Sequence, residues 1–284
     1  MDFLEAIVLG VVQGLTEFMP ISSSAHLIVV PWLFGWNEPG LAFDVALHIG
    51  TLLAVLTYFW SDWISLLRSL VRSLSGRSVQ PGESRLLWIL VVGTVPGAIA
   101  GFLAEKKINE TFHTDSTSIG GMPVGSILLI ASAVVVLGAL LFVADRIGRR
   151  TREFHGISMF DGLIIGLAQA AALLPGVSRS GATLTMGLLL GLSRPAAARF
   201  SFMLSLPIIA GAGLKESYDV VQVGLSGKEA LLFATGVVTA AIAGYLCIAG
   251  LLRFLQSNTT TAFVLYRFAL GAALVVLALS RGGL

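Results

Sequence analysis

The feature that most constrains this chain is a series of apolar stretches that are each about as long as a lipid bilayer is thick. A helix that crosses the hydrocarbon core needs about 20 apolar residues. Six stretches approach that length: residues 41–60, 86–104, 123–144, 196–214, 230–253 and 262–280. Only 12% of the residues are charged, which is about half the share in soluble domains. The sequence therefore predicts an all-α polytopic membrane protein with six transmembrane helices.

Two further apolar regions, residues 3–34 and 157–192, are too long for one ordinary span. The first is broken by PISSSAH (residues 20–26) and the second by PGVSRSGAT (residues 175–183). Non-helical backbone at membrane depth occurs only where protein or a wet cavity satisfies its polar groups. We therefore expect two re-entrant hairpins, in which a short helix enters the membrane, the chain turns, and a second short helix returns.

The two hairpins match each other at an offset of 156 residues. The matches fall on small and polar positions: Gly10 with Gly166, Gln13 with Gln169, Ser22 with Ser178, Ser24 with Ser180, and Glu5 with Asp161 as a conservative exchange. Chance identity of small residues is the alternative, but three spans follow each hairpin, so the order of elements repeats as well. We expect one integral membrane domain over residues 1–284, with repeat one at about 1–144 and repeat two at about 157–284.

Because the number of spans in each repeat is odd, the second repeat is expected to enter the membrane upside down relative to the first. The loops at 61–85 and 145–156 are rich in arginine, and the positive-inside rule assigns such loops to the cytoplasm. The first hairpin would then enter from outside and the second from the cytoplasm, so that their tips approach each other inside the bilayer. The acidic amino terminus has no signal-peptide pattern, so we expect no removable leader.

Charge and cysteine content exclude several classes of function. A net charge of +2 gives no electrostatic argument for binding nucleic acid. The single cysteine, Cys247, excludes a disulfide or a cysteine-rich metal site within the chain.

The hairpin tips carry ionisable residues, which are costly inside a membrane and are functional candidates by default. Glu17 and His26 belong to the first hairpin and Arg179 to the second. A structural Glu17–Arg179 ion pair, or a histidine bound to a helix-end carbonyl, would explain each one singly. Their coincidence with several hydroxyl groups at the same depth favours a functional site.

The residue types at the tips suit phosphoryl transfer. Arg179 offers a planar fork of donors for phosphate oxygens, and Ser178, Ser180 and Thr183 add further donors. The first hairpin adds a carboxylate, an imidazole and a hydroxyl nucleophile from among Ser22, Ser23 and Ser24. Glu17, with Gln13 one turn earlier, would ligate a divalent cation, Mg²⁺ or Ca²⁺.

Four other polar residues lie in or beside the predicted spans. Asp44 and His48 are one helical turn apart and would either pair with each other or line the cavity. Arg199 is expected to extend toward the interface, and Arg267 to reach an internal partner.

The motifs QGLTEF, PISSSAH and PGVSRSGAT resemble those of the bacterial undecaprenyl-diphosphate phosphatase family, also called the bacitracin-resistance protein family. The resemblance covers nearly the whole chain. It implies hydrolysis of the lipid undecaprenyl diphosphate to undecaprenyl phosphate, which recycles the carrier lipid for cell-wall synthesis. It also implies a multi-pass protein of the bacterial plasma (inner) membrane, with its active site open to the periplasm or cell exterior.

The resemblance also implies residue roles. Ser23 would be the nucleophile, Glu17 a metal ligand or base, His26 a proton-transfer or phosphate-contacting residue, and Arg179 the phosphate clamp. Ser22, Ser24, Ser178, Ser180 and Thr183 would bind substrate. Gln13 stands where the family pattern allows Glu or Gln, which leaves one fewer negative ligand for a metal. Attack by Ser23 and direct attack by water both stay open.

Three alternatives stay open or are disfavoured at this stage. The type-2 phosphatidic acid phosphatases have a similar SR motif, but they require histidine and aspartate where this chain has Thr185 and Leu189. A transporter or flippase for a phosphate-bearing lipid or solute would also use the repeat and the anion site. A structural scaffold would use the polar tips only for helix packing. The partners expected are the lipid diphosphate and membrane lipids, and a homodimer stays open.

Overall fold

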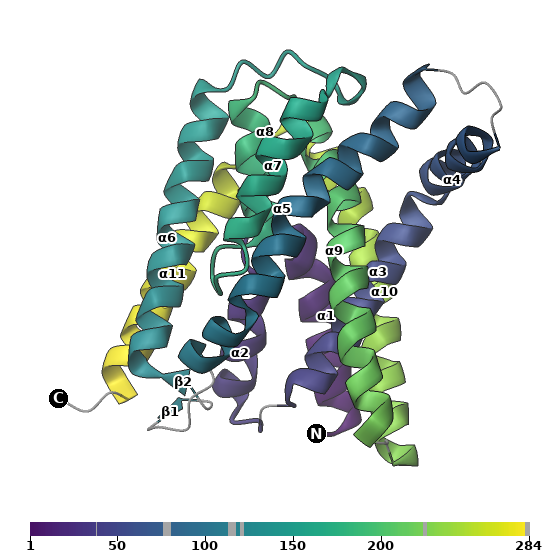
Figure 1. Cartoon of the computed structure of the whole chain (residues 1–284). Coiled ribbons are helices and arrows are strands. Elements are labelled where there is room, and N and C mark those ends of the chain that lie inside the picture. Colours follow the sequence, from purple (N-terminus) through teal and green to yellow (C-terminus); the bar gives the residue numbers. More distant parts are fainter. Residues whose placement is uncertain (38, 76–80, 113–117, 120–121, 224–225, 282–284) are drawn as a thin grey trace.

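The computed structural model describes residues 1–37, 39–75, 81–112, 118–119, 122–223 and 226–281, and these are almost entirely helical (Figure 1). The first half contains α1 (Phe3–Phe18), α2 (Ser23–Phe34), α3 (Leu41–Tyr58), α4 (Trp60–Leu74), α5 (Pro81–Phe112), the short strands β1 (Ser118–Ile119) and β2 (Met122–Pro123), and α6 (Val124–Ile147). The second half contains the 3-10 helix η1 (Phe154–Gly156), α7 (Met159–Ala171), α8 (Arg179–Leu189), α9 (Arg194–Val223), α10 (Gly227–Ser257) and α11 (Thr261–Arg281).

Helices cover each of the six ranges predicted to span the membrane. By length and composition, four spans within the described residues can cross a bilayer: Arg85–Leu103, Gly125–Ile147, Gly227–Ser257 and Thr261–Ser280. The helices Ala42–Tyr58 and Trp60–Leu74 form a bent pair with an angle of 78° between them. When this pair is counted as one span, the number of spans rises to five. The predicted span at 196–214 lies inside α9, which is continuous but does not belong to this set. The chain is therefore an all-helical, multi-pass membrane protein.

Both apolar regions that were too long for one span consist of two short helices with a break between them. α1 and α2 are separated at residues 19–22, and α7 and α8 at residues 172–178. Each first helix begins with a capping box, Asp2 with Glu5 in α1 and Ser158 with Asp161 in α7. Such boxes satisfy the free N–H groups at a helix start. In Figure 1 the two breaks lie in the middle of the molecule, reached from opposite ends.

The backbone turns in the same way at both breaks. Ser22 and Ser178 each precede the second short helix and have positive φ values, 75° and 68°. This conformation is uncommon for a residue with a side chain. These two serines are one of the pairs matched at an offset of 156 residues. The two hairpins thus share a local geometry as well as a sequence pattern.

Close backbone packing fixes each first hairpin helix against a long helix from the other half of the chain. α1 packs on α10, and α7 packs on α5. A Cβ atom on Gly166 would lie 2.1 Å from the carbonyl oxygen of Gly93, and one on Gly10 would lie 2.9 Å from that of Gly236. Small residues allow membrane helices to approach this closely.

Arg152 closes the base of the second hairpin. Its Nη1 donates to the Asp161 carboxylate and to the Leu190 carbonyl, both at 2.9 Å, which joins the start of α7 to the end of α8. The hydrogen bond to Asp161 raises the pKa of Arg152 above its ordinary value. This one guanidinium therefore ties together the two ends of the second hairpin.

Arg267, on α11, holds both hairpin tips in place. Its side chain is fully buried and donates to five backbone carbonyls: Val134 and Ala133 on α6, Pro20 in the first break, and Gly176 and Val177 in the second. The prediction that Arg267 reaches an internal partner is confirmed. Three of these partners, Pro20, Gly176 and Val177, lie in the helix breaks, where carbonyl groups lack a helical N–H.

We expect Arg267→Gln to lower the free energy of unfolding by at least about 2 kcal/mol, because each buried carbonyl left without a donor costs about 1–3 kcal/mol. Thermal unfolding of the purified protein in detergent measures this. Arg253→Gln, an exposed arginine on α10, is the matched control and should have little effect. Equal melting temperatures for the two variants would contradict the role given to Arg267.

Candidate active site

The two hairpin tips meet through side chains that are far apart in the sequence. The guanidinium of Arg179 donates to Oε1 of Glu17. Nearby, Ser180 Oγ donates to the backbone carbonyl of Met19 at 2.9 Å. The ion pair that the sequence left open as a structural alternative is therefore present, and it lies among the residues predicted to form the site.

Glu17 is the centre of this constellation. Its Oε2 accepts hydrogen bonds from Ser23 Oγ at 2.7 Å and from Gln13 Nε2 at 3.0 Å. The carboxylate is buried, at 7% exposure. A hydroxyl nucleophile needs a base within about 2.6–3.2 Å, so Ser23 and Glu17 meet the geometric requirement for nucleophile and base.

Arg179 is held from two sides and is largely buried. Besides Glu17, its guanidinium donates from Nη1 to the Ser205 carbonyl of α9 at 3.3 Å. Because α9 fixes the guanidinium, its planar donor fork faces the first hairpin in a defined orientation. This arrangement suits recognition of phosphate oxygens.

The serines of the two tips form equivalent pairs. Ser22 Oγ lies 3.2 Å from Ser24 Oγ, and Ser178 Oγ lies 3.3 Å from Ser180 Oγ. Ser22, Ser178 and Ser180 are buried, whereas Ser23 is half-buried and Ser24 is exposed. The hydroxyls that an incoming molecule can reach therefore lie mainly on the first tip.

Thr183 supports the second tip from inside α8. Its Oγ1 donates to the Arg179 carbonyl at 2.8 Å and lies 2.6 Å from Ser201 Oγ of α9. The contacts of this buried hydroxyl are with protein groups that orient Arg179. The structure thus places Thr183 behind the cluster of tip side chains.

His26 lies one turn after Ser23 on α2, but its ring contacts other groups. Nδ1 lies 2.7 Å from the Ser22 carbonyl, and Nε2 lies 2.7 Å from the hydroxyl of Tyr266 on α11. Sequence reasoning did not select Tyr266, because an isolated tyrosine in an apolar stretch carries no local signal.

His48 lies beside Glu17. Its Nδ1 contacts the backbone carbonyl of Asp44 at 2.8 Å, and its Nε2 lies 3.7 Å from Glu17 Oε2. The sequence left open whether His48 pairs with Asp44 or lines the cavity, and the structure shows both a contact with the Asp44 carbonyl and a position beside Glu17. The signal available in the sequence was a histidine near the start of a span.

A divalent cation would have Glu17 and Gln13 as protein ligands. Gln13 turns its amide nitrogen toward Glu17, and its Oε1 is a buried oxygen with no hydrogen-bond partner in the described part of the chain. No group of three or more His, Cys, Asp or Glu residues that could hold a metal occurs among the residues the structure describes. Glu17 and Gln13 are a small donor set, so a cation such as Mg²⁺ would need further oxygen ligands from the substrate phosphates.

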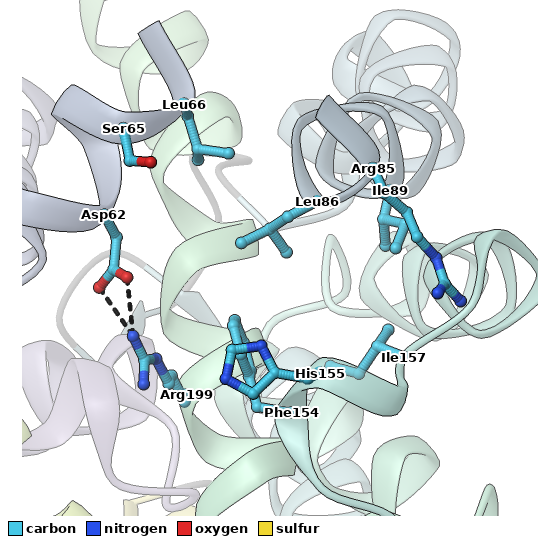
Figure 2. A pocket seen from close by; sticks show the side chains of 10 residues that line it. All are labelled: Asp62, Ser65, Leu66, Arg85, Leu86, Ile89, Phe154, His155, Ile157 and Arg199. Carbon is cyan, nitrogen blue, oxygen red and sulfur yellow. Dashed lines mark hydrogen bonds and ion pairs between the residues drawn. The ribbon is translucent and has the colours of Figure 1, made fainter. Parts of the chain in front are cut away.

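Arg199 lines a separate cavity of about 250 Å³ at the end of the molecule that carries α4 and η1 (Figure 2). Its Nη2 donates to both carboxylate oxygens of Asp62, at 2.8 and 2.9 Å, and its guanidinium lies 4.6 Å from the ring centre of Phe154. Arg199 therefore has a protein partner, Asp62. Its position at the membrane interface stays a prediction. The cavity shares no lining residue with the hairpin tips.

Comparison with known proteins agrees with the resemblance seen in the three motifs. The family model described as bacitracin resistance protein BacA matches residues 6–273. An undecaprenyl-diphosphatase of Thermomicrobium roseum is 52% identical over 277 residues, which cover 97% of this chain and 98% of that protein. Proteins of the same name from Pelotomaculum thermopropionicum and Desulforudis audaxviator are 46% and 45% identical, covering 99% of this chain and 98% and 100% of their own lengths. The chain therefore belongs to the bacitracin resistance protein BacA family.

Proposed function

We propose that this protein hydrolyses undecaprenyl diphosphate to undecaprenyl phosphate and inorganic phosphate, which recycles the carrier lipid for cell-wall synthesis and confers resistance to bacitracin. The observation that carries the proposal is the convergence of Ser23, Glu17 and Arg179 where the two hairpin tips meet. The substrate follows from the similar proteins, which are undecaprenyl-diphosphatases.

The proposed architecture is an inverted repeat of one re-entrant hairpin and three spans. Three observations support it: the sequence match at an offset of 156 residues, the equivalent capping boxes, and the equivalent positive-φ serines. The packing is also reciprocal, because α1 of the first repeat lies on α10 of the second and α7 of the second lies on α5 of the first.

In the proposed reaction, Arg179 binds the terminal phosphate of the lipid. In this structure the Glu17 carboxylate is the ion-pair partner of the Arg179 guanidinium. A phosphate group carries more negative charge than a carboxylate and would compete for the same N–H donors. Binding of substrate would therefore release Glu17 from Arg179 while leaving its hydrogen bond to Ser23. The carboxylate would then be free to accept a proton at Oε2.

The bond changes follow from this geometry. Ser23 Oγ attacks the terminal phosphorus, its proton passes to Glu17, and the bridging P–O bond breaks to release undecaprenyl phosphate. Water then hydrolyses the phosphoserine, and Ser23 regains a proton as inorganic phosphate leaves. The alternative route uses the same residues, with Ser23 orienting a water molecule that attacks phosphorus directly. Arg179 neutralises the developing charge in both routes.

We expect Ser23→Ala and Arg179→Ala each to lower kcat by about 100-fold or more in a phosphate-release assay, because each removes a group that acts on the reacting phosphate. Arg179→Lys keeps the charge but loses the planar fork, so its activity should be intermediate. Ser132→Ala, which alters an exposed serine on α6 bonded only to its own helix, is the control. Melting temperatures measured alongside separate loss of activity from loss of fold.

Unchanged turnover in folded Ser23→Ala and Arg179→Ala would contradict the proposal and favour the scaffold role. A transporter needs the anion site formed by Arg179, but it has no use for the hydrogen bond from Ser23 to Glu17. Ser23→Ala therefore separates the enzyme from a protein that only binds the lipid.

The proposed cofactor is a divalent cation, Mg²⁺ or Ca²⁺, held by Glu17, Gln13 and the substrate diphosphate. When bound, it would neutralise charge between the two phosphates. We expect EDTA to abolish phosphate release and added Mg²⁺ to restore it. Gln13→Glu adds a second carboxylate, so it should lower the Mg²⁺ concentration that gives half-maximal activity. Turnover that is unaffected by EDTA would contradict a metal requirement.

The proposed location is the bacterial plasma membrane, with the arginine-rich loops in the cytoplasm and the site open to the periplasm or cell exterior. In a Cys247→Ala background, a membrane-impermeant maleimide applied to intact cells should label Asn37→Cys. It should label Thr151→Cys only after the membrane is permeabilised. Both positions are exposed. Asn37 follows α2 of the first hairpin, and Thr151 precedes α7 of the second. The reverse labelling pattern would contradict the orientation.

A further inference from the structure

α11 presents two consecutive polar residues to the hairpins. Arg267 points inward and binds carbonyls of both tips, whereas Tyr266 reaches the first hairpin at His26. The phenol oxygen lies 2.7 Å from His26 Nε2, and the two rings are nearly parallel, with an interplanar angle of 10° and centroids 5.5 Å apart. A rigid part of the fold therefore fixes the approach of Tyr266 to His26.

The second contact of His26 determines which ring nitrogen carries the proton. Nδ1 lies 2.7 Å from the Ser22 carbonyl, and a carbonyl oxygen can only accept. Nδ1 must therefore be the donor, and in the neutral ring Nε2 is left as an acceptor. The Tyr266 hydroxyl can then donate to Nε2, so it holds the ring in place in the tautomer that the carbonyl selects.

The two rings differ in how much of their surface is exposed. His26 is buried, at 6% exposure, whereas Tyr266 is 45% exposed. The phenol is thus the outward neighbour of a buried imidazole.

We propose that Tyr266 is a positioning residue for the phosphatase reaction, whose hydroxyl donates to Nε2 and fixes the orientation of the His26 ring one turn after Ser23. The inference rests on the proposed function, because it assigns a role within that reaction. It gives Tyr266 a task beyond the packing expected of an exposed aromatic residue on a membrane helix.

Tyr266→Phe tests this role because it keeps the ring and removes only the hydroxyl. We expect kcat to fall by about 3- to 10-fold, the effect of one neutral hydrogen bond, with little change in KM. Tyr245→Phe is the matched control, since Tyr245 on α10 is 44% exposed and its ring packs on Tyr58. The same kcat for both variants would overturn the proposal.

A double-mutant cycle shows whether the effect passes through His26. In a His26→Asn background, Tyr266→Phe should cause no further loss of kcat, since residues that act as one unit are not additive. An equal loss in both backgrounds would assign Tyr266 a general structural effect and would overturn the proposal.

Nitrogen NMR of the protein with ¹⁵N-labelled histidine provides a readout that is independent of turnover. The chain has only four histidines, so the His26→Asn variant identifies the His26 signals. We expect the wild-type His26 shifts to be those of the Nδ1–H tautomer, and the Nε2 signal to move in Tyr266→Phe because that nitrogen loses its hydrogen bond. Identical shifts in the two proteins would overturn the proposal. If the wild-type protein released no phosphate, the proposed function would fail, and the NMR experiment would still test the contact with His26.

Discussion

A helix that breaks inside a lipid bilayer leaves carbonyl oxygens with neither a helical N–H nor water to donate to them. This constraint applies to the proposed architecture, in which two helices break within the membrane. Arg267 resolves it by placing one buried guanidinium between both breaks and α6. Without such a donor, the polar turns could not stay at the centre of the molecule. The site therefore depends on a residue that takes no part in the proposed chemistry.

The same two breaks create the functional surface. Each turn brings serine hydroxyls and the N-terminus of a short helix to the tip of its hairpin. The two tips differ in their other polar residues. The first carries Glu17 and Ser23, and the second carries Arg179, which stands where the sequence match would place the counterpart of Ser23. Joining the tips brings Ser23, Glu17 and Arg179, the proposed nucleophile, base and cationic clamp, within hydrogen-bonding distance. Neither hairpin contains this set alone.

The sequence predicted the elements that depend on local composition. Hydrophobic length indicated the spans, and proline, glycine and serine clusters indicated the breaks. Glu17 and Arg179 were selected because ionisable residues are rare in apolar stretches, whereas Ser23 was distinguished from Ser22 and Ser24 only by the family resemblance. The contacts of Tyr266 with His26 and of Arg199 with Asp62 could not be predicted in this way, since they join residues 240 and 137 positions apart. Gln13 was expected to offer an oxygen to a metal, but its amide orientation became visible only beside Glu17.

The central claim is that the joined tips break a phosphoanhydride bond and do not merely bind a phosphate-bearing lipid. The most direct measurement follows inorganic phosphate and lipid binding together, with purified wild-type protein and undecaprenyl diphosphate in detergent. The account predicts many equivalents of inorganic phosphate per protein molecule, with undecaprenyl phosphate as the lipid product. Saturable binding of the intact diphosphate with no release of inorganic phosphate would contradict it.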